Sequence, residues 1–414
     1  MHISIFLSFC YFAAIVVTGQ KVAKSVKHVS QSFDLSLKDR SDSSSGSSSY
    51  SVIKFENLGF SGTYQLVKEL SDVTSDKCTC ELSDDTTSFS GSNAPFNEEV
   101  SVHFRGPLVL SLFGYFTSEN FLVGDNSSGS WERRAYYGAS SSTSENVTFL
   151  TKAGTDSPCL GKALTYAGSN GTSEAKESTV LSQDAQISSN EEYVIFSNIS
   201  CDSSGFDNDC GVYRSGIPAY HGYYGKIKMF LFEFKMPTES EKDEDTSNYN
   251  MPAIWLLNAH IPRTSQYALN VNCSCWRSGC GEFDIFEIMN TTEANDLYST
   301  VHDYQGTGDI ENGLQADGHL TRDTEGTMKG GVVFDKDGNA IVFMSNSSTF
   351  DSNISASKLN SWIEEAGYSV VDKLDSVTAT STSKSSKGEA IHFYKTTAIQ
   401  KLFAYLSILV TLFV

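Results

Sequence analysis

The stretch from Glu282 to Met289 constrains the fold of this chain more than any other, because it sets three carboxylates into an otherwise apolar run, Glu282-Phe283-Asp284-Ile285-Phe286-Glu287-Ile288-Met289. Phenylalanine, isoleucine and methionine at these spacings predict a buried β-strand. An ionised carboxylate in such a strand is costly unless it has a partner or a function.

A regular strand would divide these carboxylates between its two faces. Side chains alternate along a strand, so Glu282 and Asp284 would point to one face and Glu287 to the other. One extra residue near Ile285-Phe286, a β-bulge, would return Glu287 to the face of its two neighbours. The sequence therefore predicts a bulged strand with three carboxylates on one face. The alternative is an acidic strand whose carboxylates face water or bind calcium.

Three carboxylates on one face suit retaining glycoside hydrolysis, which needs two carboxyl groups about 5–5.5 Å apart. One of them attacks the anomeric carbon, and the other protonates the leaving oxygen. Repulsion between like charges raises the pKa of at least one carboxyl group, which keeps an acid protonated near its working pH.

The flanking segments carry a resemblance to a known family. A second apolar strand is expected at Met251–Leu257, Cys275–Gly281 leads into the carboxylates, and Ser299–His302 follows them. Together with the carboxylate strand, these segments resemble glycoside hydrolase family 16, the jelly-roll family of laminarinases and related β-glucanases, in its bulged Glu-x-Asp-x-x-Glu branch.

The resemblance implies a role for each polar residue of the predicted site. Glu282 would be the nucleophile and Glu287 the general acid/base, with Asp284 and His302 as their supports. A lone histidine is more often a structural residue, but the position of His302 after Glu287 matches the family, and its expected task is to hydrogen-bond a carboxylate.

Aromatic side chains are expected to form the sugar subsites, because glucan rings have apolar faces that stack on tryptophan and tyrosine. Trp276 and Trp255 flank the carboxylate strand in sequence and are the candidate substrate-binding residues. Trp255 lies inside an apolar strand, so a core position is an equally good interpretation for it.

Composition favours an exported protein that faces a glycan. The chain has 414 residues, of which 12% are aromatic and 19% charged, with a formal net charge of −20. This aromatic and apolar content excludes global disorder. Nucleic acid is excluded as a partner because its phosphates would be repelled. A neutral polysaccharide fits, and no cofactor or metal is expected.

Both ends of the chain read as targeting signals. An apolar run from Ile3 to Val17 precedes a small-residue cleavage site before Gln20. At the other end, Leu402–Val414 is apolar but short for a membrane-spanning helix. With small residues and a spacer before it, this tail predicts a GPI anchor at Gly388, with Ser386 and Ser385 as alternatives. We therefore expect a secreted protein held at the cell wall and the outer face of the plasma membrane, in contact with the membrane only through the anchor.

Cysteine and asparagine usage agrees with export. Of nine cysteines, Cys10 leaves with the signal, and an even number remains, which predicts disulfides. A metal site at Cys273, Cys275 and Cys280 is the alternative, although no histidine lies at ligand spacing. A disulfide that stiffens the loop before Glu282 is favoured. N-glycosylation is expected at Asn126, Asn146, Asn170, Asn198, Asn346 and Asn353, whereas the sequons at Asn272 and Asn290 lie close to the predicted site and are expected to be unoccupied.

The expected organisation is a signal peptide at 1–19, a Ser-rich spacer at 20–49, a β-sandwich at 50–370, a Ser/Thr-rich stalk at 371–388 and a removed signal at 389–414. Strand patterns dominate the sandwich, and the best candidate for a helix is Ser355–Gly367. Only about 80 residues separate Glu287 from the stalk, fewer than the later strands of a jelly roll require. Residues 50–116 would supply the missing strands through a circular permutation, a rearrangement that domains tolerate because their chain ends often lie close together.

Further segments sharpen the resemblance. They are Phe89–Gly91, Glu98–Leu108, Trp131–Tyr137, Cys210–Arg214 and Ile261–Thr264. They resemble the fungal GPI-anchored cell-wall proteins described as probable circularly permuted β-1,3-glucanases, over about Tyr50 to Trp362. The implied fold is an all-β jelly-roll sandwich of glycoside hydrolase family 16 type, and the implied partner is the β-1,3-glucan of the wall.

Two classes of function stay open at this point. One is an enzyme: a retaining endo-β-1,3-glucanase active in wall remodelling, or a transglycosylase if an acceptor sugar replaces water. The other is a structural wall protein that binds glucan without cleaving it. The complete set of three carboxylates favours the enzyme, because binding alone does not require buried, mutually repelling charges.

Overall fold

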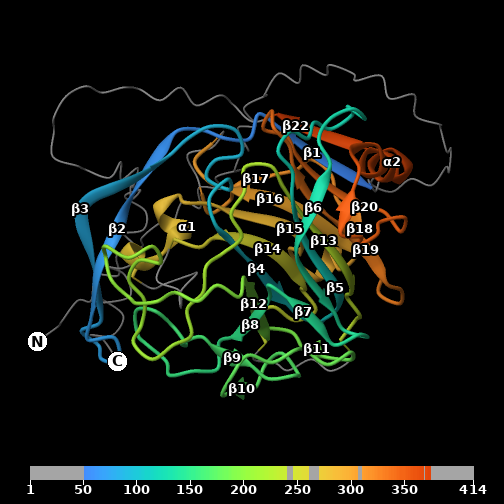
Figure 1. Ribbon diagram of the computed structural model, residues 1–414. Coiled ribbons are helices and arrows are strands. Elements are labelled where there is room, and N and C mark those ends of the chain that lie inside the picture. The colour runs from blue at the N-terminus through green and yellow to red at the C-terminus, as the bar shows by residue number, and fades with distance from the viewer. Residues whose placement is uncertain (1–50, 240–245, 261–269, 306–309, 368, 374–414) are drawn as a thin grey trace, which may run out of the picture. The chain divides into compact units, whose positions relative to one another are not determined.

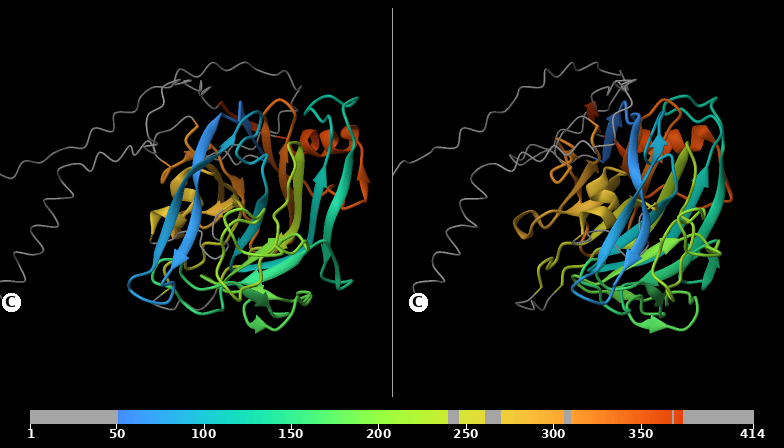
Figure 2. Two further views of the ribbon diagram at one scale, coloured as in Figure 1. Left: turned by 60° about the vertical axis from the view of Figure 1, so that its left-hand side comes forward. Right: turned by 90° about the vertical axis from the view of Figure 1, so that its left-hand side faces the viewer.

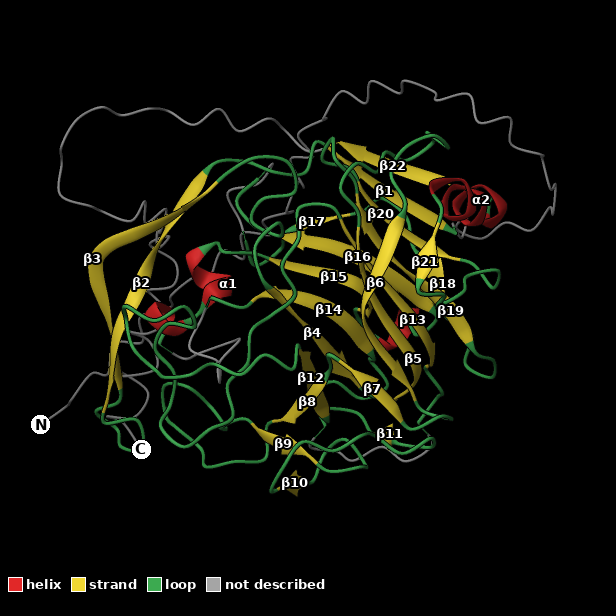
Figure 3. Ribbon diagram, viewed as in Figure 1, coloured by secondary structure: helices red, strands yellow, loops and turns green. Residues whose placement is uncertain are grey.

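The protein is a β-sandwich of two curved, mainly antiparallel sheets (Figure 1, Figure 3). The computed structural model describes residues 51–239, 246–260, 270–305, 310–367 and 369–373. All of them belong to one compact unit within residues 38–414. The expected all-β jelly-roll fold is thereby confirmed.

We call the sheet that carries Glu282–Ile288 the carboxylate sheet, and the other the back sheet. The carboxylate sheet has the order β10 (Glu174–Ala175), β9 (Thr165–Ala167), β8 (Thr148–Thr151), β12 (Glu192–Phe196), β4 (Val100–Arg105), β14 (Ala253–Asn258), β15 (Glu282–Ile288), β16 (Asp296–His302) and β17 (Leu314–Gln315), with β18 (Leu320–Thr321) also on β16. The back sheet has the order β21 (Asn353–Ile354), β6 (Trp131–Gly138), β5 (Leu108–Thr117), β13 (Lys228–Lys235), β19 (Met328–Phe334), β20 (Ala340–Met344), β1 (Val52–Glu56) and β22 (Ser369–Lys373), with β11 (Gln186–Ile187) on β5 and β7 (Thr143–Glu145) on β6.

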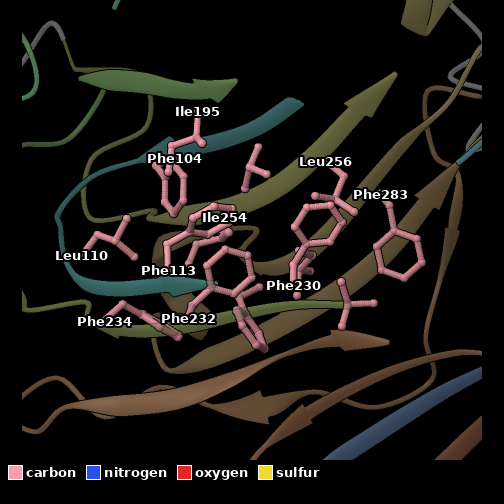
Figure 4. Packing of buried hydrophobic residues seen from close by; sticks show 14 of the residues in the cluster. Phe104, Leu110, Phe113, Ile195, Phe230, Phe232, Phe234, Ile254, Leu256 and Phe283 are labelled. Carbon is pink, nitrogen blue, oxygen red and sulfur yellow. The ribbon is translucent and has the colours of Figure 1, made fainter. Parts of the chain in front are cut away.

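The main core fills the space between the two sheets. Phe104, Ile254 and Phe283 point into it from the carboxylate sheet, and Phe113 and Phe232 from the back sheet (Figure 4). All five are completely buried. Because side chains alternate along each strand, the facing halves of two sheets supply this layer, and the other halves are left for other partners.

A second apolar layer covers the far face of the back sheet. There α2 (Ala356–Ala366) packs Leu359 and Trp362 against Met229 and Leu231 of β13. Buried on both faces, β13 reads as a nearly continuous apolar run. The helix begins after Ser355, whose side chain accepts a hydrogen bond from the Lys358 N–H, and ends at Gly367. The predicted helix is therefore confirmed.

Strands from the first part of the chain lie inside both sheets. β4 pairs with β12 on one side and β14 on the other, while β5 pairs with β13. β1 lies between β20 and β22. Strands at 100–105 and 253–258 are thus neighbours although about 150 residues of chain separate them, as the permuted fold requires. The pairing of β22 continues to Lys373, past the expected boundary at 370.

A long hairpin, β2 (Gly62–Ser71) and β3 (Thr79–Phe89), forms a separate two-stranded sheet (blue in Figure 2). Disulfides join its far end to the rest of the unit: Cys78 to Cys159, and Cys80 to Cys273 in η1 (Val271–Cys273). Its near end packs Tyr64 and Phe89 against Leu257 of β14. The hairpin is therefore held close to the segment that precedes the carboxylates.

Candidate active site

A β-bulge in β15 puts all three carboxylates on one face. Asp284 lies opposite Trp255 and Glu287 opposite Ala253, so β15 uses one more residue than β14 between these pairs. The register against β16 shifts at the same place. Phe283, Ile285, Phe286 and Ile288 all lie in the core. The bulge predicted at Ile285-Phe286 is confirmed. We call the opposite face, with Glu282, Asp284 and Glu287, the carboxylate face.

Asp284 and His302 form a buried ion pair on this face. The Asp284 Oδ2 and His302 Nε2 atoms are 3.0 Å apart, and His302 Nδ1 lies 2.7 Å from the backbone oxygen of Ile310. Both ring nitrogens face acceptors, so the imidazolium form, with two N–H donors, satisfies them. Burial lowers the pKa of His302, but the hydrogen bond and charge of Asp284 outweigh it and raise this pKa to about 9. His302 is thus a cation at neutral pH.

Glu287 is a carboxyl group that titrates near neutral pH. Its pKa is raised to about 7, first by burial and then by the charge of Asp284, while Arg105 acts in the opposite direction. The guanidinium of Arg105 lies 3.0 Å from Glu287 Oε1 and also donates to the backbone oxygen of Met251. Burial outweighs the ion pair, so Glu287 can hold a proton in weak acid and release it near pH 7.

Of the two predicted catalytic glutamates, Glu282 is more deeply buried than Glu287. It begins β15, between Leu257 of β14 and His302 of β16, and is 3% exposed. Its charge acts on His302, as that of Asp284 does. The structure thus brings Glu282, Asp284, Glu287 and His302 together, as the sequence predicts. The His302 cation is paired with Asp284 and lies near Glu282, whereas Glu287 is paired with Arg105 and is also influenced by the charge of His302.

β4 contributes three polar residues that the sequence analysis did not identify. Ser101, His103 and Arg105 alternate with core residues and share the carboxylate face, because His103 pairs with Trp255 and Arg105 with Ala253. His103 Nε2 lies 2.9 Å from Ser101 Oγ. Burial, and then Lys152, lowers the pKa of His103 well below its usual range, so the ring is neutral. The alternation of polar and apolar residues in Val100–Arg105 was the available signal.

The two candidate tryptophans lie in different surroundings. Trp276, in α1 (Cys275–Ser278), is partly exposed, and its ring centroid lies 5.6 Å from that of His302. Trp255 is 2% exposed and stacks on His103 with centroids 5.1 Å apart. A ring so covered cannot stack on a sugar, so the structure contradicts a subsite wall at Trp255. The Arg105 guanidinium lies over this ring, 6.0 Å from its centroid.

The cysteines after residue 20 are all in disulfides, including Cys275–Cys280 and Cys201–Cys210. The metal alternative for Cys273, Cys275 and Cys280 is therefore wrong. The Cys275–Cys280 bond closes the loop that carries Trp276, and both of its cysteines are buried. It braces the segment between Trp276 and Glu282, as expected.

The predicted glycosylation sites differ in accessibility. Exposed positions are Asn126, Asn170, Asn198, Asn346 and Asn353. Asn146 is only partly exposed, and its amide donates to the backbone oxygen of Arg134. The amides of Asn272 and Asn290 donate to Cys80 and Glu293. Such amide hydrogen bonds also occur at Asn146 and at Asn353, whose amide donates to Ser352, so they do not distinguish the two sequons expected to be unoccupied.

The targeting predictions fall outside the described residues. They concern the signal at 1–19 and the anchor candidates Gly388, Ser386 and Ser385. Across the described parts of the chain, none of the helices has the length and apolar character needed to traverse a bilayer.

Comparison with known proteins gives one consistent result. Residues 129–362 match the family described as "Cell wall protein YJL171C/Tos1, C-terminal", and residues 51–118 match its N-terminal counterpart. A Candida albicans protein named "Probable circularly permuted 1,3-beta-glucanase PGA52" is 63% identical over 340 residues, which cover 81% of this chain and 88% of that protein.

Two Saccharomyces cerevisiae relatives carry names of the same form. The "Probable circularly permuted 1,3-beta-glucanase YJL171C" is 53% identical over 358 residues, 85% of this chain and 90% of the relative. The one named TOS1 is 31% identical over 434 residues, 77% of this chain and 91% of the relative. No solved structure shows significant similarity.

Proposed function

This chain belongs to the YJL171C/Tos1 cell wall protein family, and from that membership and its carboxylate face we propose that it is a retaining endo-β-1,3-glucanase of the cell wall. The observation that carries the proposal is the state of Glu287. It is a largely buried carboxyl group whose pKa is raised to about 7, on the same face as two further carboxylates. This is the property required of a general acid in weakly acidic surroundings.

In the first step, Glu282 attacks the anomeric carbon of the glucosyl unit and forms a glycosyl ester. Glu287 donates its proton to the departing glycosidic oxygen in the same step, so that the leaving sugar departs as an alcohol. In the second step, Glu287, now a carboxylate, removes a proton from water. That water displaces Glu282 from the anomeric carbon, and the product keeps the β-configuration.

Asp284 and His302 are positioning residues in this scheme. The Asp284 carboxylate lies 3.0 Å from the His302 cation. This ion pair fixes the bulged strand and therefore the positions of the two glutamates that the strand carries. The negative charge of Asp284 raises the pKa of Glu287 and favours the acid form. The positive charge of His302 lies next to Glu282 and favours its ionised, nucleophilic form.

We further propose that Trp276 supplies an aromatic subsite, since its ring is partly exposed beside His302. We also propose that the protein is attached to the wall or membrane through a GPI anchor at Gly388 and that the exposed sequons carry glycans. The family's description as cell wall proteins supports that location.

The test is a product assay on linear β-1,3-glucan with purified residues 20–387. Wild type should release oligosaccharides that NMR shows to be β-anomers at the moment of cleavage. Glu282→Gln should abolish turnover with unchanged glucan binding. Glu287→Gln should lose activity on glucan but retain it on aryl glucosides with good leaving groups, and azide should accelerate its second step.

Four outcomes would count against the proposal. Products of α-configuration, or full activity in Glu282→Gln, would overturn the assignment of residues. Glucan binding by the wild type without any cleavage would favour a structural wall protein. Longer products made from short ones would instead identify a transglycosylase that uses the same two glutamates.

A further inference from the structure

A disulfide outside the carboxylate face has a histidine and a glutamate aligned on it. Cys201 and Cys210 are bonded, and the Cys210 sulfur lies 3.4 Å from Nε2 of His221. The other ring nitrogen, Nδ1, lies 2.9 Å from Glu99 Oε1. Both sulfurs and a nitrogen of His221 fall within 4.8 Å of one another. The order sulfur, imidazole, carboxylate is the arrangement that activates a cysteine in nucleophilic enzymes.

Backbone contacts hold this group in place from both sides. The His221 N–H donates to the Ile199 oxygen, and the Cys201 N–H donates to the Ala219 oxygen, so the two segments run side by side. Glu99 accepts a second hydrogen bond, at 3.0 Å, from the N–H of Gly222. The carboxylate therefore has a fixed position behind the ring, and the ring has a fixed position against Cys210.

The two sulfurs are not equivalent. Cys210 is 7% exposed and touches His221, whereas Cys201 is only partly buried. An external thiolate therefore reaches Cys201 more easily. Thiol–disulfide exchange is fastest when the sulfur that leaves is stabilised as a thiolate, and a neighbouring imidazolium provides that stabilisation. Accessibility and leaving-group stability thus favour the same direction of attack.

We propose that Cys201–Cys210 is a thiol-exchange site, at which a small external thiol such as glutathione forms a mixed disulfide with Cys201. The thiolate sulfur bonds to Cys201, and the electron pair of the broken bond passes to Cys210. That thiolate lies against Nε2 of His221, which can donate a hydrogen bond to it, while Glu99 holds the ring at Nδ1. One disulfide is lost and one is formed, so no net oxidation occurs.

The other disulfides lack this combination. Both sulfurs of Cys80–Cys273 and of Cys275–Cys280 are buried. Cys78–Cys159 also has one partly exposed sulfur, but its neighbour is the hydroxyl of Ser157, 3.4 Å from Cys78. A hydroxyl carries no charge to stabilise a thiolate. Cys78–Cys159 therefore serves as the comparison within the same protein, because it is an accessible disulfide without a neighbouring histidine.

Loop length favours the same bond. Cys201 and Cys210 are 9 residues apart, whereas the Cys78–Cys159 and Cys80–Cys273 bonds span 81 and 193 residues. A disulfide that closes a short loop constrains the unfolded chain least. Opening Cys201–Cys210 should therefore leave the sandwich folded.

The test is limited exchange of the purified full chain with glutathione, followed by alkylation and peptide mass spectrometry. We expect glutathione on Cys201 and alkylated Cys210, before any labelling of the other cysteines. A histidine beside the departing sulfur makes it a better leaving group, an effect on the order of tenfold in exchange rate. His221→Ala should therefore slow exchange at this bond about tenfold, and Glu99→Gln should slow it in the same direction.

A matched control is His319→Ala, because His319 also pairs with a carboxylate, that of Asp296 at 3.5 Å, but touches no cysteine. It should leave the rate unchanged. The labelling pattern of the wild type tests the proposal by itself, so the proposal can still be refuted if His221→Ala does not fold. Glutathione on Cys210, simultaneous labelling of Cys78, or an unchanged rate in a folded His221→Ala protein would overturn it.

Discussion

The ion pair between Arg105 and Glu287 should control the pH at which Glu287 loses its proton. Arg105→Met keeps a side chain of similar length but removes the charge 3.0 Å from Glu287 Oε1. Both side chains are well covered, with 11% and 17% exposed, so solvent screens the pair weakly. A cation so close lowers a carboxyl pKa by about 1–3. In Arg105→Met, the pKa of Glu287 should rise from about 7 by that amount.

The first readout is the pH dependence of kcat/KM on β-1,3-glucan. Its basic limb reports the general acid of the free enzyme, which we propose to be Glu287. The limb should lie near pH 7 in the wild type and move upward by about 1–3 in Arg105→Met. Arg105→Lys keeps a cation and should move the limb less. An unmoved limb in Arg105→Met would refute the proposed role of this pair.

The second readout is stability, which does not depend on activity. The folded-state pKa of Glu287 lies above the ordinary value of 4.5, so this group opposes folding once pH rises through 4.5 toward about 7. In the wild type this loss of stability stops growing above pH 7, because folded Glu287 is then ionised beside Arg105, whereas in Arg105→Met it continues to a higher pH. With a pKa raised by 1–3, the substitution should cost about 1 kcal/mol more at pH 8 than at pH 5.

Denaturant unfolding at the two pH values measures this difference. The hydrogen bond from Arg105 to the Met251 oxygen is lost equally at both, so it cancels. Arg322→Met is the control, since Arg322 is also buried but binds backbone oxygens such as those of Met236 and Ala294. Its cost should be the same at pH 5 and pH 8. If Arg105→Met lowers the free energy of unfolding equally at pH 5 and pH 8, the pKa of Glu287 does not depend on the Arg105 cation.

Three further predictions concern the surroundings of the site and its location. Asp284→Asn should lower the pKa of His302 from about 9, because burial then acts with less opposition; NMR titration of the ring would show this, and an unchanged value would contradict the ion pair. Trp276→Ala should raise KM for glucan about tenfold with little change in kcat, the loss expected for one stacking contact of about 1.5 kcal/mol; an unchanged KM would remove Trp276 from the subsites. Deleting residues 391–414 should release soluble, glycosylated protein into the medium, and retention at the cell surface would contradict the anchor.

Local features of this protein could be predicted from its sequence because they depend on neighbouring residues. The carboxylates in an apolar strand indicated a buried strand with a bulge, since an unbulged strand would have put Glu287 in the core. Ser355 and Gly367 delimited the C-terminal helix through capping chemistry. An even number of cysteines indicated disulfides, but not which cysteines were joined.

The partners of these residues depended on the tertiary structure. Arg105 reaches Glu287 only because β4 pairs with β14, a contact between segments about 150 residues apart that no local pattern specifies. The same pairing stacks His103 on Trp255. This covers the tryptophan ring, which therefore cannot serve as the expected subsite wall. Cys210, His221 and Glu99 likewise meet only after folding. A short segment of sequence determines which groups are present and which way a strand turns them, but burial and charge pairing arise between distant segments, and these decide how each group titrates.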